Sequence, residues 1–88
     1  MVMYLDLKKV FGKNVKYYRF ENKLTQAKLS EKVCISSTYL SEIERGQHTV
    51  DFDTITSLAN SLNVEPYELF IKNKNIHLPR RIDMFKNK

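Results

Sequence analysis

The chain has 88 residues, a formal net charge of +5 at pH 7 and one cysteine, Cys34. This length suits a single small domain near the lower limit of what one hydrophobic core can stabilise, and it excludes a nucleotide-binding sheet. The lone cysteine excludes an internal disulfide, and no stretch approaches membrane-spanning length or resembles a secretion signal, so we expect a soluble, cytoplasmic protein.

The charge is unevenly distributed along the chain. Residues 1–32 contain eight basic and three acidic residues, residues 33–70 one basic and six acidic, and residues 71–88 six basic and one acidic. Both ends are therefore basic, and the middle is acidic. A basic surplus suits an anionic partner such as nucleic acid, although charge alone fits a solvated lysine surface better.

The first amphipathic helix is expected to begin after the cap residue Asp6 and to end near Asn22, which tolerates the left-handed conformation. Apolar residues recur at spacings of four, four and three, on one helix face: Leu7, Phe11, Val15 and Tyr18. Gly12 inside this helix costs roughly 1 kcal/mol against alanine. Close packing against a neighbouring helix is the expected reason for this glycine.

Two short amphipathic segments follow with almost nothing between them. Thr25 is expected to cap a helix over residues 26–33, and Ser36 to cap another over residues 37–45. Gly46 is expected to end the second helix in the left-handed conformation. So tight a connection forces two helices to cross steeply, which predicts a helix-turn-helix arrangement.

The two short helices have distinct inward and outward faces. We expect them to bury Ala27, Leu29, Val33, Leu40 and Ile43. The outward face of the second helix is then polar, with Ser37, Thr38, Ser41, Glu42 and Arg45. In a helix-turn-helix unit, this outward face is the one presented to the major groove of DNA.

Two further helices are expected after a polar linker at residues 47–50. Asp51 caps a fourth helix that Asn63 closes, and Glu65 and Pro66 open a fifth. A hydrophobic staple accompanies each of the five caps, in the pairs Leu5–Val10, Leu24–Leu29, Ile35–Leu40, Val50–Ile55 and Val64–Leu69. Because these staples agree with the caps on the helix boundaries, the sequence predicts an all-α fold.

The short helices also contain two runs that carry a family resemblance, LTQA at residues 24–27 and YLSEIERG at residues 39–46, together with Leu29 and Val33. With them, the chain resembles the Cro and phage-repressor (XRE-like) type of helix-turn-helix transcription regulator over about residues 7–70. The resemblance implies a five-helix, lambda-repressor-like domain that binds double-stranded DNA.

We expect the DNA-binding domain to occupy residues 1–70, with the helix-turn-helix motif at residues 25–46. Three positions depart from the family habit. Lys23 and Cys34 stand where glycine is common, and Val50 stands where proline is common. These departures concern the local geometry of turns rather than the fold.

Eight residues are candidates for DNA contact: Gln26, Ser36, Ser37, Thr38, Tyr39, Ser41, Glu42 and Arg45. The resemblance implies that Gln26 hydrogen-bonds a phosphate. Ser36 is expected to cap its helix in any case and is a further phosphate candidate. Arg45 is another phosphate candidate, with a contact to the helix dipole as its alternative role. The residues expected to face bases are Ser37, Thr38, Ser41 and Glu42. Tyr39 is expected either to reach the DNA backbone or to pack partly against its own domain.

Glu42 has two open interpretations. It is either a specificity element that accepts a hydrogen bond from a cytosine amino group, or a residue turned toward a lysine. A buried or half-buried ion pair is expected between Arg19 and Glu44, because Glu44 falls on the inward side of its helix, where an unpaired carboxylate is costly. The resemblance implies the same pairing.

No catalytic, cofactor, metal or small-molecule site is expected. His48 and His77 have no partners at ligand spacing and are expected to be exposed, although His48 can reach a phosphate. Cys34 alone cannot complete a metal site and is expected to pack as a small hydrophobe at the turn. The protein is therefore not expected to be an enzyme.

Residues 71–88 form a basic extension that is too apolar for a purely disordered tail, with Ile76, Leu78, Ile82, Met84 and Phe85. We expect it to pack on its own domain or across a dimer interface. A DNA-contacting arm is the alternative.

The sequence thus predicts a sequence-specific regulator that binds a palindromic operator as a homodimer. Repression is the default mechanism, because binding alone suffices for it. A restriction-modification controller, which the Thr38-Tyr39 start of the second motif helix fits, or an antitoxin that represses its own operon is the alternative within this class. A helical protein-interaction module is the alternative from another class; Glu42, Glu44 and the acidic middle favour it, whereas Gln26 and the polar face oppose it.

Overall fold

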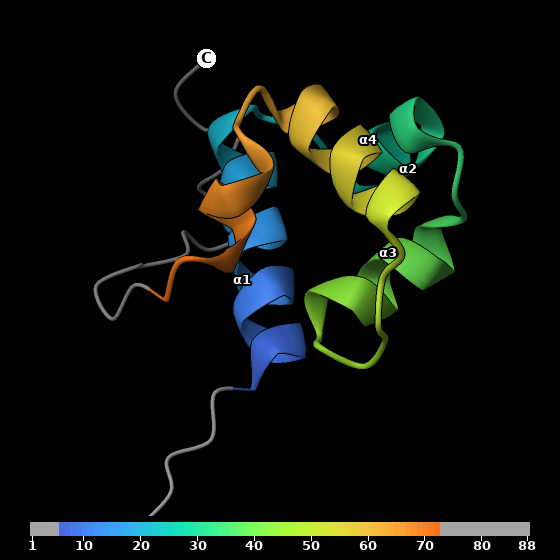
Figure 1. Ribbon diagram of the computed structural model, residues 1–88. Coiled ribbons are helices and arrows are strands. Elements are labelled where there is room, and N and C mark those ends of the chain that lie inside the picture. Colours follow the sequence, from blue (N-terminus) through green and yellow to red (C-terminus); the bar gives the residue numbers. More distant parts are fainter. Residues whose placement is uncertain (1–5, 73–88) are drawn as a thin grey trace, which may run out of the picture.

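The computed structural model describes residues 6–72, which form four α-helices and one 3₁₀ helix. The elements are α1 (Leu7–Glu21), α2 (Gln26–Val33), α3 (Ser37–Glu44), α4 (Phe52–Leu62) and the 3₁₀ helix η1 (Pro66–Phe70). No strand occurs within this part of the chain, and the predicted all-α fold is confirmed. Helix α1 lies between η1 and α3 and packs on both, while α2 packs on α3 and α4 (Figure 1). Between residues 6 and 72, no helix has the length and apolar character to cross a membrane.

All four α-helices begin after a side chain that caps them, as the sequence predicts. The side chains of Asp6, Thr25, Ser36 and Asp51 accept hydrogen bonds from the backbone N–H groups of Lys9, Lys28, Tyr39 and Thr54. These bonds satisfy donors that the first turn of a helix leaves without a partner. The hydrogen bonds from Thr54 also hold the pKa of the Asp51 carboxyl below its ordinary value. The helix starts therefore follow from local chemistry.

Two of the predicted helices end or wind differently from expectation. The fifth is a 3₁₀ helix of five residues, Pro66–Phe70, rather than an α-helix. It is short, as helices of this form usually are, because their hydrogen-bond geometry is poorer than that of an α-helix. Helix α3 ends at Glu44, and Arg45 is its C-cap, one residue earlier than predicted.

Four residues that follow helices adopt the left-handed backbone conformation. Gly46 (φ 76°) and Asn63 (φ 62°) do so as predicted, whereas Lys23 (φ 58°) takes the place expected for Asn22. Cys34 closes α2 at φ 61°. Lys23 and Cys34 are the positions where the resembling family commonly has glycine, so the turns keep the glycine-type geometry without glycine. A side chain with a Cβ in this conformation costs roughly 1–2 kcal/mol.

The replacement Cys34→Gly is expected to raise the free energy of unfolding by about 0.5–1 kcal/mol, since relief of the left-handed strain exceeds the extra entropy of an unfolded glycine. Urea denaturation measures this change. Cys34→Ser is the matched control, because it removes the thiol but keeps the Cβ, and it should leave the midpoint near that of the parent. An equal gain in both variants would show that the thiol, not the backbone, is responsible.

The hydrophobic core lies where the helices meet, with buried Phe11, Val15, Leu29, Leu40, Ile43, Leu58, Ala59, Leu62 and Leu69. Two predicted members lie outside it. Ala27 is exposed, because it is two positions before Leu29 and therefore points to the other side of α2. Leu7 is 46% exposed at the first turn of α1. Val33 and Tyr18 are partly buried and pack against the core.

Gly12 brings the backbones of α1 and α3 into direct contact. A Cβ atom at this position would lie 2.2 Å from the carbonyl oxygen of Ile43 and 2.8 Å from that of Glu44. The expected close packing at this glycine is therefore confirmed. Only a residue without a side chain lets α3 approach α1 so closely.

Asn14 attaches the end of the described chain to α1. Its buried side chain donates from Nδ2 to the carbonyl oxygens of Leu69, at 2.9 Å, and Ile71, at 3.0 Å. Nothing in the sequence singles out this asparagine, because its partners lie more than fifty residues further along. Outside the described residues lie Leu5 of the first staple, His77, and the apolar residues named above for the C-terminal extension, Ile76, Leu78, Ile82, Met84 and Phe85.

Candidate nucleic-acid interface

Helix α3 has a buried inner face and a polar outer face. Leu40, Ile43 and Glu44 are buried against the rest of the domain. The outer side chains come together as predicted, with Ser37, Thr38 and Arg45 exposed and Ser41 and Glu42 half-buried. Because these positions are separated by one, three or four residues, they share one side of the helix. We call these five residues the outer face of α3.

A buried ion pair joins α1 to the inner face of α3. Arg19 Nε lies 2.7 Å from Glu44 Oε2, and Arg19 Nη2 donates to Glu44 Oε1 at 3.0 Å. The two side chains are 4% and 2% exposed. Arg19 Nη1 also donates to the carbonyl oxygen of Leu24 at 2.9 Å. The predicted pairing is confirmed, and its two-pronged geometry is the strong form of such a contact.

Gln26 extends this network to the start of α2. Its side-chain Nε2 donates to Glu44 Oε1 at 2.9 Å, and the residue is half-buried. One carboxylate thus receives hydrogen bonds from both α1 and α2. The network sets the orientation of α3 relative to the two helices that precede it. The sequence suggests only a phosphate contact for Gln26, and this hydrogen bond to Glu44 is an additional, structural role.

Serine side chains connect α2 to the first turn of α3. Ser30 Oγ is buried, donates to the carbonyl oxygen of Ala27 at 2.9 Å and lies 3.2 Å from Ser37 Oγ. Ser36 uses its oxygen to accept from the N–H of Tyr39 at 3.0 Å. The hydroxyl groups at this end of α3 are therefore held in place by the motif itself.

Arg45 lies back along α3 rather than extending away from it. Its Nη1 donates to Ser41 Oγ, one helical turn earlier, and its Nη2 donates to Gln47 Oε1 at 3.4 Å. The guanidinium group is exposed and lies at the end of the outer face. It therefore adds a positive charge next to the polar side chains that precede it.

Glu42 faces a histidine and not a lysine. Its Oε1 lies 2.7 Å from Nε2 of His48, in the loop after α3. The His48 ring also packs against the ring of Tyr39, with 5.3 Å between centroids. Tyr39 itself is half-buried and packs against the core, which is one of its two predicted roles. His48 is exposed, as predicted, and it contacts both Glu42 and Tyr39.

The comparison with known protein families decides the class of protein. The helix-turn-helix family matches residues 15–69, which include α2, α3 and α4. The chain belongs to this family of DNA-binding transcription regulators. The family suggested by the sequence resemblance is confirmed. The predicted function, a DNA-binding regulator of transcription, is confirmed as well.

Three relatives of this helix-turn-helix regulator are controller proteins. It is 31% identical over 71 residues to the control protein C.SmaI of Serratia marcescens, across 81% of this chain and 84% of that protein. It is 32% identical over 65 residues to the control protein C.BamHI of Bacillus amyloliquefaciens, across 73% and 80%. The crystal structure of the restriction-modification controller protein C.AhdI from Aeromonas hydrophila matches with a TM-score of 0.69 and 33% identity, across 72% of this chain and 96% of that one.

The turn of this helix-turn-helix regulator places Cys34 differently from expectation. Its side chain is exposed and does not pack as a small hydrophobe. The reason is the left-handed backbone at this residue, which ends α2 and turns the chain toward Ile35. Ile35, and not Cys34, is the turn residue that packs against the core.

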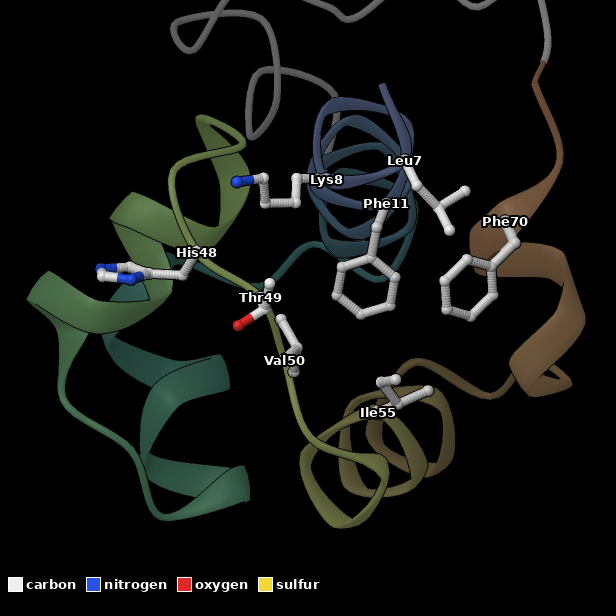
Figure 2. A pocket seen from close by; sticks show the side chains of 8 residues that line it. All are labelled: Leu7, Lys8, Phe11, His48, Thr49, Val50, Ile55 and Phe70. Carbon is white, nitrogen blue, oxygen red and sulfur yellow. The ribbon is translucent and has the colours of Figure 1, made fainter. Parts of the chain in front are cut away.

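The regulator also has a cavity of about 230 Å³ behind the loop that follows α3. Its lining residues come from α1, the loop, α4 and η1: Leu7, Lys8, Phe11, His48, Thr49, Val50, Ile55 and Phe70. The rings of Phe11 and Phe70, two of these lining residues, lie 5.1 Å apart. Figure 2 shows that the His48 ring points away from these side chains and toward α3. The loop therefore borders an apolar cavity on one side and the outer face of α3 on the other.

Proposed function

We propose that this regulator represses transcription by binding a palindromic operator as a homodimer. The outer face of α3 carries the proposal, because it presents hydroxyl, carboxylate and guanidinium groups on a helix whose other side is locked into the core. These groups can hydrogen-bond to base edges in the major groove. Occupation of a promoter is then enough to block transcription. The exposed thiol of Cys34 fits a reducing cytoplasm, where we place the protein.

The proposed base contacts come from Ser37, Thr38, Ser41 and Glu42. The serine and threonine hydroxyls can donate or accept, and the methyl group of Thr38 can contact a thymine methyl. Glu42 can accept from a cytosine amino group. Ser37 and Thr38, in the first turn of α3, are the residues that a recognition helix inserts first.

The proposed phosphate contacts are Gln26 and Ser36 before the base-reading residues, Arg45 after them, and Tyr39, which lies among them and also packs against the core. Gln26 Nε2 uses one hydrogen on Glu44 and keeps a second for a phosphate oxygen. Ser36 accepts from a backbone N–H through its oxygen, which leaves its hydroxyl hydrogen to donate. Contacts of this type set the docking position without reading sequence.

Large exposed apolar side chains support the homodimer. Leu7, Phe52, Tyr67 and Ile71 are 46%, 85%, 66% and 49% exposed. A dimer interface that covered such side chains would remove their apolar surface from water, which favours association. A two-fold dimer would present two copies of α3 to half-sites about one DNA turn, roughly 34 Å, apart.

Control of a restriction-modification system is the second candidate function. The observation that favours it is the match to C.SmaI and C.BamHI over most of the length of both proteins. The structural match to C.AhdI covers 96% of that controller protein. A palindromic operator upstream of a restriction gene, recovered by selection from genomic fragments, would identify this role.

The assignment of base and phosphate contacts predicts different results for different residues. Thr38→Ala and Glu42→Ala are expected to weaken binding by about 1–3 kcal/mol and to relax preference at particular base pairs. Arg45→Ala should weaken binding to all sequences and flatten the dependence of affinity on salt. Competition with single-base variants of a selected operator measures the first effect, and salt titration the second. Unchanged rank order in both Thr38→Ala and Glu42→Ala would show that the outer face does not read bases.

The rival interpretation, a protein-interaction module, is tested by binding to long duplex DNA of arbitrary sequence. Phosphate contacts release counterions, so the affinity of a DNA-binding protein falls steeply as salt rises. A chain that used this fold only to bind other proteins would show no such dependence.

A further inference from the structure

His48 lies outside α3 but makes two contacts with that helix. Its Nε2 is 2.7 Å from Glu42 Oε1, and its ring centroid is 5.3 Å from that of Tyr39. Tyr39 and Glu42 are three positions apart, so the imidazole spans one turn of the helix surface. Figure 2 shows the ring directed toward α3 and away from the cavity that Thr49 and Val50 line. The position of the imidazole is therefore determined on two sides.

The chemistry of the pair determines which atom donates. An ionised carboxylate only accepts hydrogen bonds, so His48 Nε2 must carry the hydrogen that lies between the two groups. Glu42 Oε1 then has one of its two lone pairs engaged by the protein. Within residues 6–72, no hydrogen bond reaches the other oxygen, Oε2. One carboxylate oxygen is thus held by the protein while the other stays available for a donor outside it.

The carboxylate is only partly shielded from solvent. The Glu42 side chain is 32% exposed and the His48 side chain 43% exposed. A free glutamate on a helix surface loses rotamer entropy when a ligand fixes it. A side chain already held in one rotamer does not lose this entropy on binding, and it presents its acceptor in one direction. The histidine supplies this restraint.

We propose that His48 is a specificity-determining positioning residue, which holds Glu42 so that Oε2 accepts from an exposed amino group of one base in the major groove. The inference rests on the proposed function, because it requires that the outer face of α3 reads duplex DNA. Bases with such an amino group on the major-groove edge are cytosine (N4) and adenine (N6). His48 acts through Glu42 and does not itself read the base.

The test compares the binding of parent and variants to single-base variants of the selected operator at fixed salt. Glu42→Ala first identifies the base pair that Glu42 reads. His48→Ala is expected to lower discrimination at that same base pair about fivefold or more, the low end for a lost base contact. His48→Gln keeps an N–H donor and is expected to retain most of the discrimination. Thr49→Ala, in the same loop but without contact to Glu42, is the matched control and should leave it unchanged.

A double substitution tests the coupling directly. In a Glu42→Ala background, His48→Ala is expected to cause no further loss of discrimination, because its effect passes through the missing carboxylate. If His48→Ala instead weakens binding to all operator variants equally and flattens the salt dependence, His48 is a phosphate contact and the inference is wrong. The inference is equally wrong if Glu42→Ala shifts a base preference that His48→Ala leaves intact.

Failure of the inference is distinguishable from failure of the proposed function. If the parent protein shows no preference among single-base variants, the proposed function itself is wrong. Suppose that Thr38→Ala changes the preference among single-base operator variants and Glu42→Ala does not. The regulator then reads bases, and only the proposed role of the His48–Glu42 pair is overturned.

Discussion

Replacing Arg19 by alanine is expected to lower the free energy of unfolding by about 3–5 kcal/mol. The substitution leaves Glu44 without its ion-pair partner in a site where the carboxylate side chain is only 2% exposed. The lost guanidinium also leaves the carbonyl oxygen of Leu24 without its donor. Small domains are stable by only about 5–15 kcal/mol, so this loss is a large share of the total.

Chemical denaturation measures the effect, with an exposed ion pair as the control. Lys28 Nζ lies 3.9 Å from a Glu31 carboxylate oxygen on the surface of α2, with both side chains at least 70% exposed. Removing such a pair changes stability by about 0–1 kcal/mol, so Lys28→Ala should unfold near the parental midpoint. If Arg19→Ala also unfolds at the parental denaturant midpoint, the inferred role of Arg19 is wrong.

Replacing Gly12 by alanine is expected to destabilise the fold by about 3 kcal/mol or more, the upper end of what overpacking costs. Helix propensity alone predicts the opposite sign, because alanine is favoured over glycine by about 1 kcal/mol in a helix interior. The added Cβ would lie 2.2 Å from the carbonyl oxygen of Ile43, which belongs to the backbone and cannot rotate away. The contact with α3 therefore outweighs the gain within α1.

Thermal or urea unfolding of Gly12→Ala measures the balance between these two effects. Lys13→Ala is the matched control, since Lys13 is the next residue of the same helix but is exposed, and surface changes of this kind stay within about 0.5 kcal/mol. A Gly12→Ala variant more stable than the parent would mean that propensity dominates and that α3 can move away from α1 at little cost.

Gly12 and Arg19 affect the same element, the inner side of α3. One permits direct backbone contact with Ile43 and Glu44, and the other binds the Glu44 carboxylate. Helix α3 is thus fixed to α1 at two sites, which holds its outer face in one orientation relative to α1. A rigid scaffold of this kind would keep the proposed base-reading side chains in register with the proposed phosphate contacts.

The sequence by itself determined the order and starts of the helices. Caps such as Asp6, Thr25 and Ser36 bond to backbone groups three residues away, so the information is local and can be read from spacing. The burial of Leu40 and Ile43 followed from helical period, and the pairing of Arg19 with Glu44 from the cost of an unpaired buried carboxylate. The family match could likewise be recognised from contiguous residues.

Only the tertiary structure decided what depends on the path of the chain between elements. The partner of Glu42 is His48, because the loop after Gly46 folds back on α3, and no spacing rule predicts that return. Gln26 bonds to Glu44 and Asn14 to Leu69 across elements that the helix crossing angles bring together. Periodicity identifies which face of a helix is apolar, whereas the polar contacts at its edges depend on angstrom-scale placement of neighbouring helices.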